Sequence, residues 1–195
     1  MSSIIEFTIT GIAPLLMHSD RFSNPIAPET IEHKKLTSKR SKSLEDHRDI
    51  ARSEWMGGLY YDSDIGVYLP TASIRRSLIE GARLHKLGKH ISRSVIFLEH
   101  KGFPLIYKGP SDPAKLYETP KFVDTRSVKV GTSKLMRNRP RFDEWSCSGQ
   151  FSFNEAMLSL DELKMAYDAA GHFCGIGDYR PSKDGMFGTY DVELS

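Results

Sequence analysis

The end of the chain combines glycine with positive charge at a spacing that could hold an anion. Glycines stand at Gly175, Gly177, Gly185 and Gly188. Arg180 and Lys183 lie between them. Glycine lets the backbone approach a bulky ligand, and backbone amides together with cations attract negative charge. The spacing predicts a loop suited to a polyanion, with a tight structural turn before a final strand as the alternative.

A second group of cations lies in the middle of the chain. Between residues 126 and 141 the basic residues are Arg126, Lys129, Lys134, Arg137, Arg139 and Arg141, and no acid separates them. Phe142 and Trp145 follow, where they could stack on bases. The pattern predicts contact with nucleic acid. The alternative is a solvated edge hairpin whose charges discourage edge-to-edge pairing.

A third group lies on one predicted helix, residues 72–87. Its apolar residues fall at helical spacing, with Thr71 or Ser73 placed to cap its first turn. The opposite face carries Arg75, Arg76 and Arg83. This face is expected either to meet phosphates or to be an ordinary solvated surface.

Catalytic candidates are few. Asp20, beside Arg21, follows the first strand, and a lone aspartate there is most simply a turn former. His172 and Cys174 could form half of a zinc site, but no second pair accompanies them. No serine, histidine and aspartate set has a specific spacing. We therefore expect no enzyme activity, no cofactor and no metal.

Composition restricts the class of protein. The 195 residues include 39% hydrophobic and 27% charged residues, with a net charge of +2. These values fit one soluble domain, and no apolar run is long enough to span a membrane. Cys147 and Cys174 are expected to be reduced and buried, and the expected compartment is the cytoplasm, or the host cytoplasm if a phage encodes the chain.

Periodicity predicts the elements that position these residues. The mobile basic stretch 37–43 is expected to separate two helices of an insertion. The predicted order is strand 4–11, insertion 21–58 with helices 29–36 and 44–55, hairpin 59–61 and 67–69, helix 72–87, strands 94–98 and 104–107 joined around Gly102, hairpin 123–130 and 132–137 turning at Gly131, strand 146–153, helix 160–173 and strand 189–194.

This order predicts an α+β fold. Strand, helix, two strands, helix and strand make the βαββαβ core of ferredoxin-like (RRM-like) folds, here with an insertion after the first strand and a basic β-hairpin. Such sheets leave one face open, and RNA-recognition modules bind single strands on that face. The expectation is a single domain over residues 1–195, with the insertion at 21–58 and the hairpin at 122–142.

Three segments resemble the RAMP superfamily, the repeat-associated proteins that build CRISPR effector backbones. Val67–Arg83 is similar to the family's succession of strand, proline, small residue, serine and helix. Thr8–Leu16 resembles its first strand, and Gly175–Gly188 resembles its glycine-rich C-terminal loop. The three occur in the family's order and span most of the chain.

The resemblance implies a ferredoxin-like core, binding of RNA or single-stranded DNA, and side-by-side multimers. It implies that Arg75 and Arg76 meet the strand in place of the family's usual lysine, and that the hairpin 122–142 serves as a thumb. Asp20 lies where RAMP subunits that cut RNA keep an aspartate, and Asn24 and Pro25 add to that likeness.

The main hypothesis is therefore a non-enzymatic, multimeric subunit that binds the backbone of single-stranded RNA or DNA, encoded by a phage or a CRISPR-like defence locus. Two alternatives stay open. One is a structural or protein-interaction protein, such as a virion component or an inhibitor of a CRISPR complex. The other is a ribonuclease that depends on Asp20. The expected binding residues are Arg75, Arg76, Arg83, Arg126, Lys129, Lys134, Arg137, Arg139, Arg141, Arg180 and Lys183.

Overall fold

The chain folds into two compact units. A computed structural model describes residues 2–195, except for the side chains of residues 129, 130 and 133. The first unit, called the sheet unit, comprises Met1–Leu15, Tyr61–Lys108 and Asp143–Ser195. The second, called the hairpin unit, comprises Leu16–Tyr60 and Gly109–Phe142. The expected insertion and the expected basic hairpin both fall within the hairpin unit.

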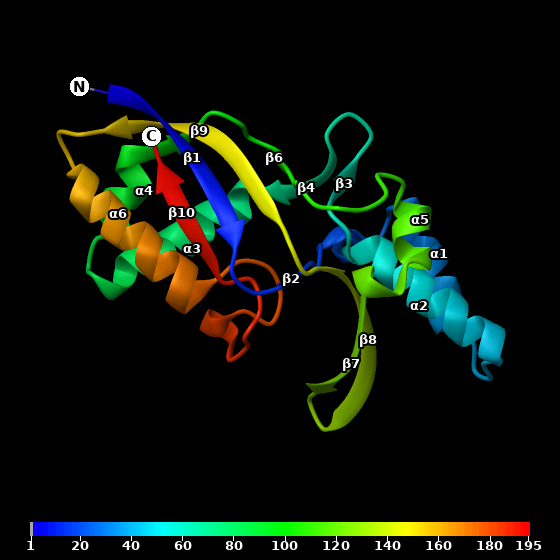
Figure 1. The fold of residues 1–195 in the computed structure, drawn as a ribbon. Coiled ribbons are helices and arrows are strands. Elements are labelled where there is room, and N and C mark those ends of the chain that lie inside the picture. Colours follow the sequence, from blue (N-terminus) through cyan, green and yellow to red (C-terminus); the bar gives the residue numbers. More distant parts are fainter. Residues whose placement is uncertain (1) are drawn as a thin grey trace. The chain divides into compact units, whose positions relative to one another are not determined.

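An antiparallel four-stranded sheet, in the order β10-β1-β9-β5, is the centre of the sheet unit (Figure 1). Its strands are β1 (Ser2–Gly11), β5 (Val95–Phe97), β9 (Ser146–Asn154) and β10 (Tyr190–Leu194). Burial alternates along β1, as the period of two predicts. The molecule is thus a mixed α+β protein with antiparallel sheets.

Two helices cover one face of this sheet. In chain order α3 (Thr71–Leu84) lies between β1 and β5, and α6 (Leu160–Ala169) lies between β9 and β10. The Tyr167 ring of α6 lies 6.1 Å from that of Phe151, and Ser77 Oγ of α3 lies 2.9 Å from the Tyr190 hydroxyl. The buried residues of this core include Phe7, Ile9, Ile74, Leu78, Phe153, Leu163 and Ala166.

The two helices differ in how their first turns are capped, and the cap of α3 differs from expectation. Ser159 and Glu162 form a capping box at the start of α6. At α3 the N-cap is Pro70 and no side chain caps the first turn, so the expected role of Thr71 or Ser73 was wrong. The Thr71 hydroxyl instead donates to the Glu99 carbonyl at 2.6 Å.

The predicted helix 160–173 changes type before its end. After α6 the chain forms a π-helical turn, η3 (Ala170–Cys174). A Cβ on Gly171 would lie 2.0 Å from the Tyr190 carbonyl oxygen, so the turn brings bare backbone against β10. Phe173 of this turn is 67% exposed.

A smaller sheet, in the order β3-β4-β6, completes the sheet unit. Its strands are β3 (Tyr61–Asp62), β4 (Gly66–Pro70) and β6 (Gly102–Pro104), and α4 (Gly88–Ser94) precedes β5. The strands expected to join around Gly102 do not pair with each other: β5 pairs with β9, and β6 pairs with β4. Phe103 of β6 packs edge-on against Phe7, at 5.0 Å between centroids. The Phe103 ring also lies 6.1 Å from that of Phe97 of β5, so β6 packs against the aromatic core without pairing with β5.

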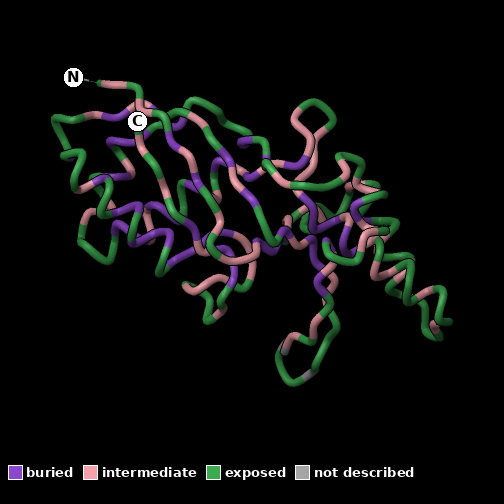
Figure 2. Tube along the Cα trace, in the orientation of Figure 1, coloured by how far each residue is buried: buried purple, intermediate pink, exposed green. Residues whose placement is uncertain are grey.

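The hairpin unit combines helices with a long antiparallel hairpin. Its elements are η1 (Arg21–Ser23), α1 (Pro28–Thr37), α2 (Leu44–Gly58), α5 (Pro113–Glu118), η2 (Pro120–Phe122), β7 (Val123–Val130) and β8 (Ser133–Phe142). β2 (Leu15–Leu16) adds a third strand beside β8. The turn has Gly131 at φ 60°, as predicted. Trp55, Leu116, Phe122 and Phe142 are buried, whereas the part of the hairpin near its turn is exposed (Figure 2).

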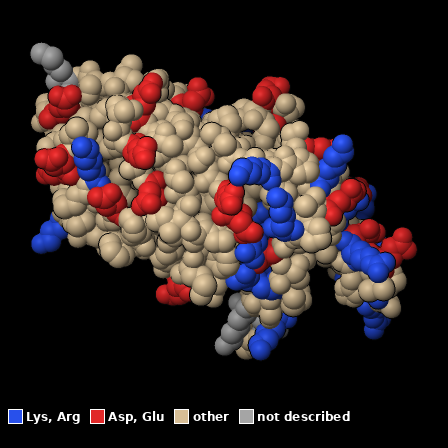
Figure 3. Space-filling model, viewed as in Figure 1, with Lys and Arg blue, Asp and Glu red and all other residues tan. Residues whose placement is uncertain are grey.

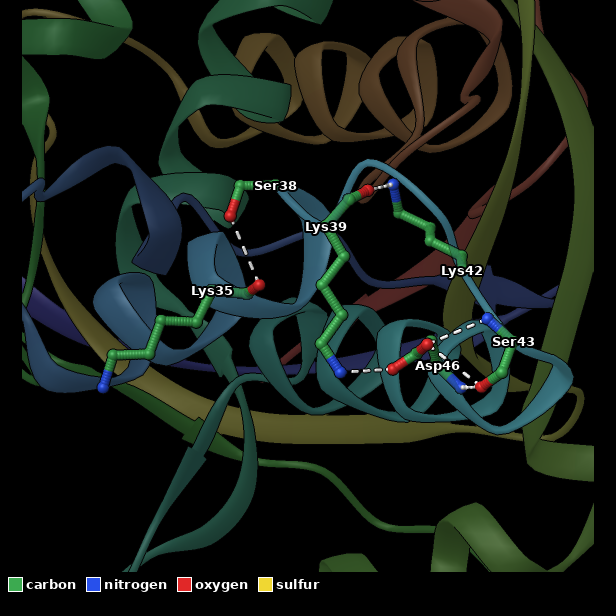
Figure 4. A network of polar contacts seen from close by, with 6 residues as sticks. All are labelled: Lys35, Ser38, Lys39, Lys42, Ser43 and Asp46. Atoms are coloured by element: carbon green, nitrogen blue, oxygen red, sulfur yellow. Dashed lines mark hydrogen bonds and ion pairs between the residues drawn. The ribbon is translucent and has the colours of Figure 1, made fainter.

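Polar contacts join α1 to α2 across the expected basic stretch 37–43 (Figure 4). Lys39 pairs with Asp46, and Lys42 Nζ donates to the Lys39 carbonyl at 2.7 Å. Ser43 and Asp46 form a capping box at the start of α2. The hydrogen bond from Lys39 is the main reason why the pKa of Asp46 falls to about 2. One lysine of this stretch is therefore already neutralised within the chain.

Candidate nucleic-acid interface

The outer face of α3 carries three exposed arginines around a hollow. Burial of Ile74, Leu78 and Ala82 turns the opposite side of the helix to solvent. A hollow of about 340 Å³ lies on that side. It is lined by Ala72, Arg75, Arg76, Ile79, Glu80 and Arg83. We call it the α3 hollow. Its guanidinium groups match the geometry of phosphate oxygens.

Glu80 is the one acid in the lining of this hollow, and it holds several of the groups around it. Arg76 Nε donates to Glu80 Oε1 at 2.9 Å. Ser182 Oγ donates to Glu80 Oε2 at 3.0 Å, and Arg180 Nη2 lies 3.6 Å from the same oxygen. Glu80 therefore ties the glycine-rich loop to α3.

The ionisation of Glu80 reflects these contacts. Burial opposes the charged form, but the hydrogen bonds from Arg76 and Ser182 and the charge of Arg180 outweigh burial, so the pKa of Glu80 lies below its ordinary value. The carboxylate is charged at neutral pH and partly offsets the arginines. Arg75 makes a different contact, because its Nη2 donates to the Ser92 carbonyl at 3.0 Å.

The glycine-rich loop is held mainly by its own backbone. Ile176 N–H donates to the Gly188 carbonyl at 2.8 Å, and Gly188 N–H donates to the Pro14 carbonyl at 2.8 Å. Gly175, Gly177 and Gly188 have positive φ angles, which glycine adopts without strain. Of the expected binding residues here, Lys183 is exposed, whereas the Arg180 side chain is only 17% exposed. The contacts make this loop a scaffold beside α3.

Much of the basic run 126–141 is engaged within the hairpin unit. Arg126 donates to both oxygens of the buried Asp124, at 2.6 and 2.5 Å. Arg137 pairs with Glu54 of α2, whose other oxygen accepts the Asn138 N–H at 2.9 Å. Arg139 is 8% exposed. The acids that engage these cations lie outside the run, so a count over 126–141 could not reveal them.

The remaining cations of the hairpin differ in accessibility. Lys134 is exposed and Arg141 is half-buried. The expected nucleic-acid contact of Lys129 lies outside the described part of the structure, which does not include the Lys129 side chain. Among the hairpin cations whose side chains the structure describes, Lys134 is therefore the best exposed for a phosphate contact.

The aromatic residues expected to stack on bases are buried. Phe142 is 0% and Trp145 is 3% exposed. Phe142 packs on Phe122 in the hairpin unit, and Trp145 Nε1 donates to the Ala13 carbonyl at 2.9 Å in the sheet unit. Their expected role was wrong, because core packing uses both rings. Exposed rings that the sequence did not single out are Phe173 and Tyr179, at 67% and 41%.

The open face of the four-stranded sheet is acidic. Alternate strand residues that face away from the helices include Glu6 of β1 and Asp191 and Glu193 of β10. Figure 3 shows acidic side chains over the part of the surface where Figure 1 places β1, β9 and β10. Among the described residues of the four strands, this face has neither lysine nor arginine nor an aromatic ring. It therefore lacks the stacking platform that RNA-recognition modules use.

The catalytic candidates stand apart from one another. Asp20 is exposed and its carbonyl accepts the Ser23 N–H at 2.7 Å in a backbone turn. His172 lies 3.5 Å from Asp191, while burial raises the pKa of Cys174. Burial likewise raises the pKa of Cys147 to about 12, so its thiol stays protonated. Over the described part of the chain, no cluster of histidine, cysteine and acidic residues has the geometry of a metal site.

Within the described residues, none of the helices combines the length and the hydrophobicity that crossing a bilayer requires.

Comparison with known proteins does not assign the chain to a family. No model of a known protein family matches the chain, and no curated protein is significantly similar to it.

Proposed function

We propose that this protein binds the sugar-phosphate backbone of single-stranded nucleic acid with the outer face of α3, without catalysing a reaction. The observation that carries the proposal is the α3 hollow, which Arg75, Arg76 and Arg83 line together with the apolar residues Ala72 and Ile79. Guanidinium groups form paired, charge-assisted hydrogen bonds with phosphate. The exposed Ala72 and the half-buried Ile79 add apolar surface that suits the sugar and base of a flexible strand.

The order of the elements supports a ferredoxin-like core for this site. Within the sheet unit the four strands of the main sheet have the sequence order 4-1-3-2 across the sheet, and a helix follows the first and the third. The sequence resemblance to RAMP proteins belongs to the same proposal. It adds the expectation that several copies bind side by side along one strand.

Backbone contacts make binding tolerant of sequence. Arginine on phosphate reads charge and spacing, not base identity, so RNA and single-stranded DNA are both candidate ligands. Lys183 adds exposed charge on the neighbouring glycine-rich loop. The acidic open face of the sheet repels the same ligand.

Binding is tested with fluorescein-labelled single strands of about 20 nucleotides, one of deoxythymidine and one of uridine. Anisotropy is recorded between about 50 and 200 mM salt. In the triple variant Arg75→Ala, Arg76→Ala and Arg83→Ala, affinity at low salt should fall by about tenfold or more. The salt slope should flatten by about two, because each phosphate contact on a single strand contributes about 0.7.

A charge-matched control separates the effect of the α3 hollow on binding from the effect of net charge. Arg93→Ala, Lys108→Ala and Lys164→Ala remove three exposed cations of the sheet unit that do not line the α3 hollow. This control should retain most of the affinity and most of the salt slope. Absence of binding by the wild-type protein at low salt, or an equal loss in both triple variants, would contradict the proposal.

A further inference from the structure

A second, larger hollow opens where two strands of the sheet unit separate. Leu98 N–H still bonds to the Gln150 carbonyl of β9, at 3.2 Å, and Ile106 pairs again with Ser146. Between these points the chain leaves β9, and β6 pairs with β4 instead. The hollow, of about 690 Å³, lies beside the stretch of β9 that this departure leaves. We call it the β9 hollow.

The lining of the β9 hollow combines apolar surface with carboxylates from three separate segments. Leu98 is 44% exposed and Pro104 is exposed, so these two residues contribute apolar surface, whereas the rings of Phe7 and Phe103 are almost wholly buried. The acids are Glu6 on the sheet face, Asp64 in the turn between β3 and β4, and Glu99 after β5. Among the described residues that line it, none is a lysine, arginine or histidine.

The segments that carry these acids are held in place by the fold. Asp62 Oδ1 accepts the N–H groups of Asp64 and Ile65 at 2.9 and 3.3 Å, which fixes the β3–β4 turn. Lys101, next to the lining residue Gly102 in the chain, pairs with Asp62 and does not line the hollow. The Thr71 hydroxyl donates to the Glu99 carbonyl and so holds the segment after β5. The carboxylates of Asp64 and Glu99 are thus presented on braced segments.

We propose that the β9 hollow docks an extended basic segment of a partner protein. Charge complementarity carries the assignment, because the lining combines carboxylates from three segments with apolar surface, which suits the methylene stem and charged end of lysine or arginine. The hollow exceeds the volume of one such side chain, and its acids are spread over separate segments. Both features favour successive basic residues of an extended peptide. Nucleic acid is excluded here by its own charge.

The test uses a fluorescein-labelled heptapeptide with arginine at its third and fifth positions and glycine, serine and threonine elsewhere. Anisotropy measured with the full chain should report saturable binding. Glu99→Gln and Asp64→Asn should each weaken binding by about two- to fivefold. The triple variant Glu6→Gln, Asp64→Asn and Glu99→Gln should weaken peptide binding by about tenfold or more. The same peptide with glutamine in place of arginine should not bind.

Glu193→Gln is the matched control, because Glu193 is an exposed acid of the same sheet that does not line the β9 hollow. It should bind the peptide as the wild type does. An equal loss in Glu193→Gln, or no loss in the triple variant, would overturn the assignment. So would spermine displacing the peptide and binding more tightly than it, or self-association of the protein that the same substitutions abolish. Because nucleic-acid affinity is measured separately, this test stands whether or not α3 binds phosphate.

Discussion

At the scale of single residues, Glu80 decides how much positive charge the α3 hollow presents. Its carboxylate accepts hydrogen bonds from Arg76 and Ser182 and lies near Arg180. The same contacts attach the glycine-rich loop to the helix. Glu80 therefore stabilises the fold while competing with any anion for Arg76.

We expect Glu80→Gln to lower stability and raise nucleic-acid affinity at once. At neutral pH the free energy of unfolding should fall by about 1 kcal/mol, because charge-assisted hydrogen bonds are replaced by weaker ones. Affinity for the labelled single strand should rise by about two- to fivefold, since a negative charge leaves the hollow. Urea denaturation and anisotropy measure the two effects.

The stability difference should depend on pH in one direction. The pKa of Glu80 in the folded protein lies below its ordinary value of 4.5, so the unfolded chain binds the proton more readily. The contribution of Glu80 is thus complete above about pH 4.5 and is lost as pH falls below that value through the folded-state pKa. Wild type and Glu80→Gln should converge in acid. A difference that persists unchanged at low pH, or an equal affinity gain in Glu193→Gln, would argue against this role.

At the scale of elements, the glycine-rich loop depends on close backbone packing. A Cβ on Gly188 would lie 1.8 Å from the Ile176 carbonyl oxygen, and Gly188 has φ 67°. The loop in turn positions Ser182 and Arg180 beside α3. Its glycines are therefore required by the fold, whatever ligand α3 binds.

Two glycine substitutions separate backbone strain from steric clash. Gly66 has φ 82°, but nothing lies within 4 Å of a Cβ built there. Gly66→Ala should cost about 1 to 2 kcal/mol of unfolding free energy, from the left-handed conformation alone. Gly188→Ala should cost clearly more, about 3 kcal/mol or above, because the loop must also move. Equal losses in urea denaturation would show that the contact between Gly188 and Ile176 relaxes freely.

At the scale of the whole molecule, each compact unit has a hydrophobic core with one tryptophan. Trp55 is buried in the hairpin unit, where its Nε1 donates to the Phe122 carbonyl at 2.9 Å. Trp145 is buried in the sheet unit. Since the chain has two tryptophans, replacing either by phenylalanine leaves a fluorescent probe of one unit.

These probes should show that the two units respond differently to mutation. Glu54→Ala removes the partner of Arg137 and Asn138, which should destabilise the hairpin unit by about 1 to 3 kcal/mol. The urea midpoint reported by Trp55 should fall more than that reported by Trp145. In Gly188→Ala the urea midpoint reported by Trp145 should fall more than that reported by Trp55. Equal shifts at both probes would mean that the chain unfolds as one cooperative body.

Local patterns predicted the secondary structure well, because periodicity and turn chemistry act over short stretches. The strand at β1, the helices α2 and α6 and the turn at Gly131 follow from residues that are neighbours in sequence. Strand partners were less predictable. β6 pairs with β4 instead of β5, and its Phe103 packs against Phe7, so its surroundings depend on residues far apart in the chain.

The sequence by itself determined where the cations lie, and the tertiary structure decided which of them are accessible. Arg137 meets Glu54 across 83 positions, and Phe142 and Trp145 lie in cores, so neither the charge run nor its neighbouring rings could be assessed from spacing. Arg75, Arg76 and Arg83 stay on the surface because the other side of α3 is buried, which helical periodicity does predict. The amino-acid composition determines the net charge, but the folded structure determines which charged side chains form ion pairs or are buried, since both depend on distances in space.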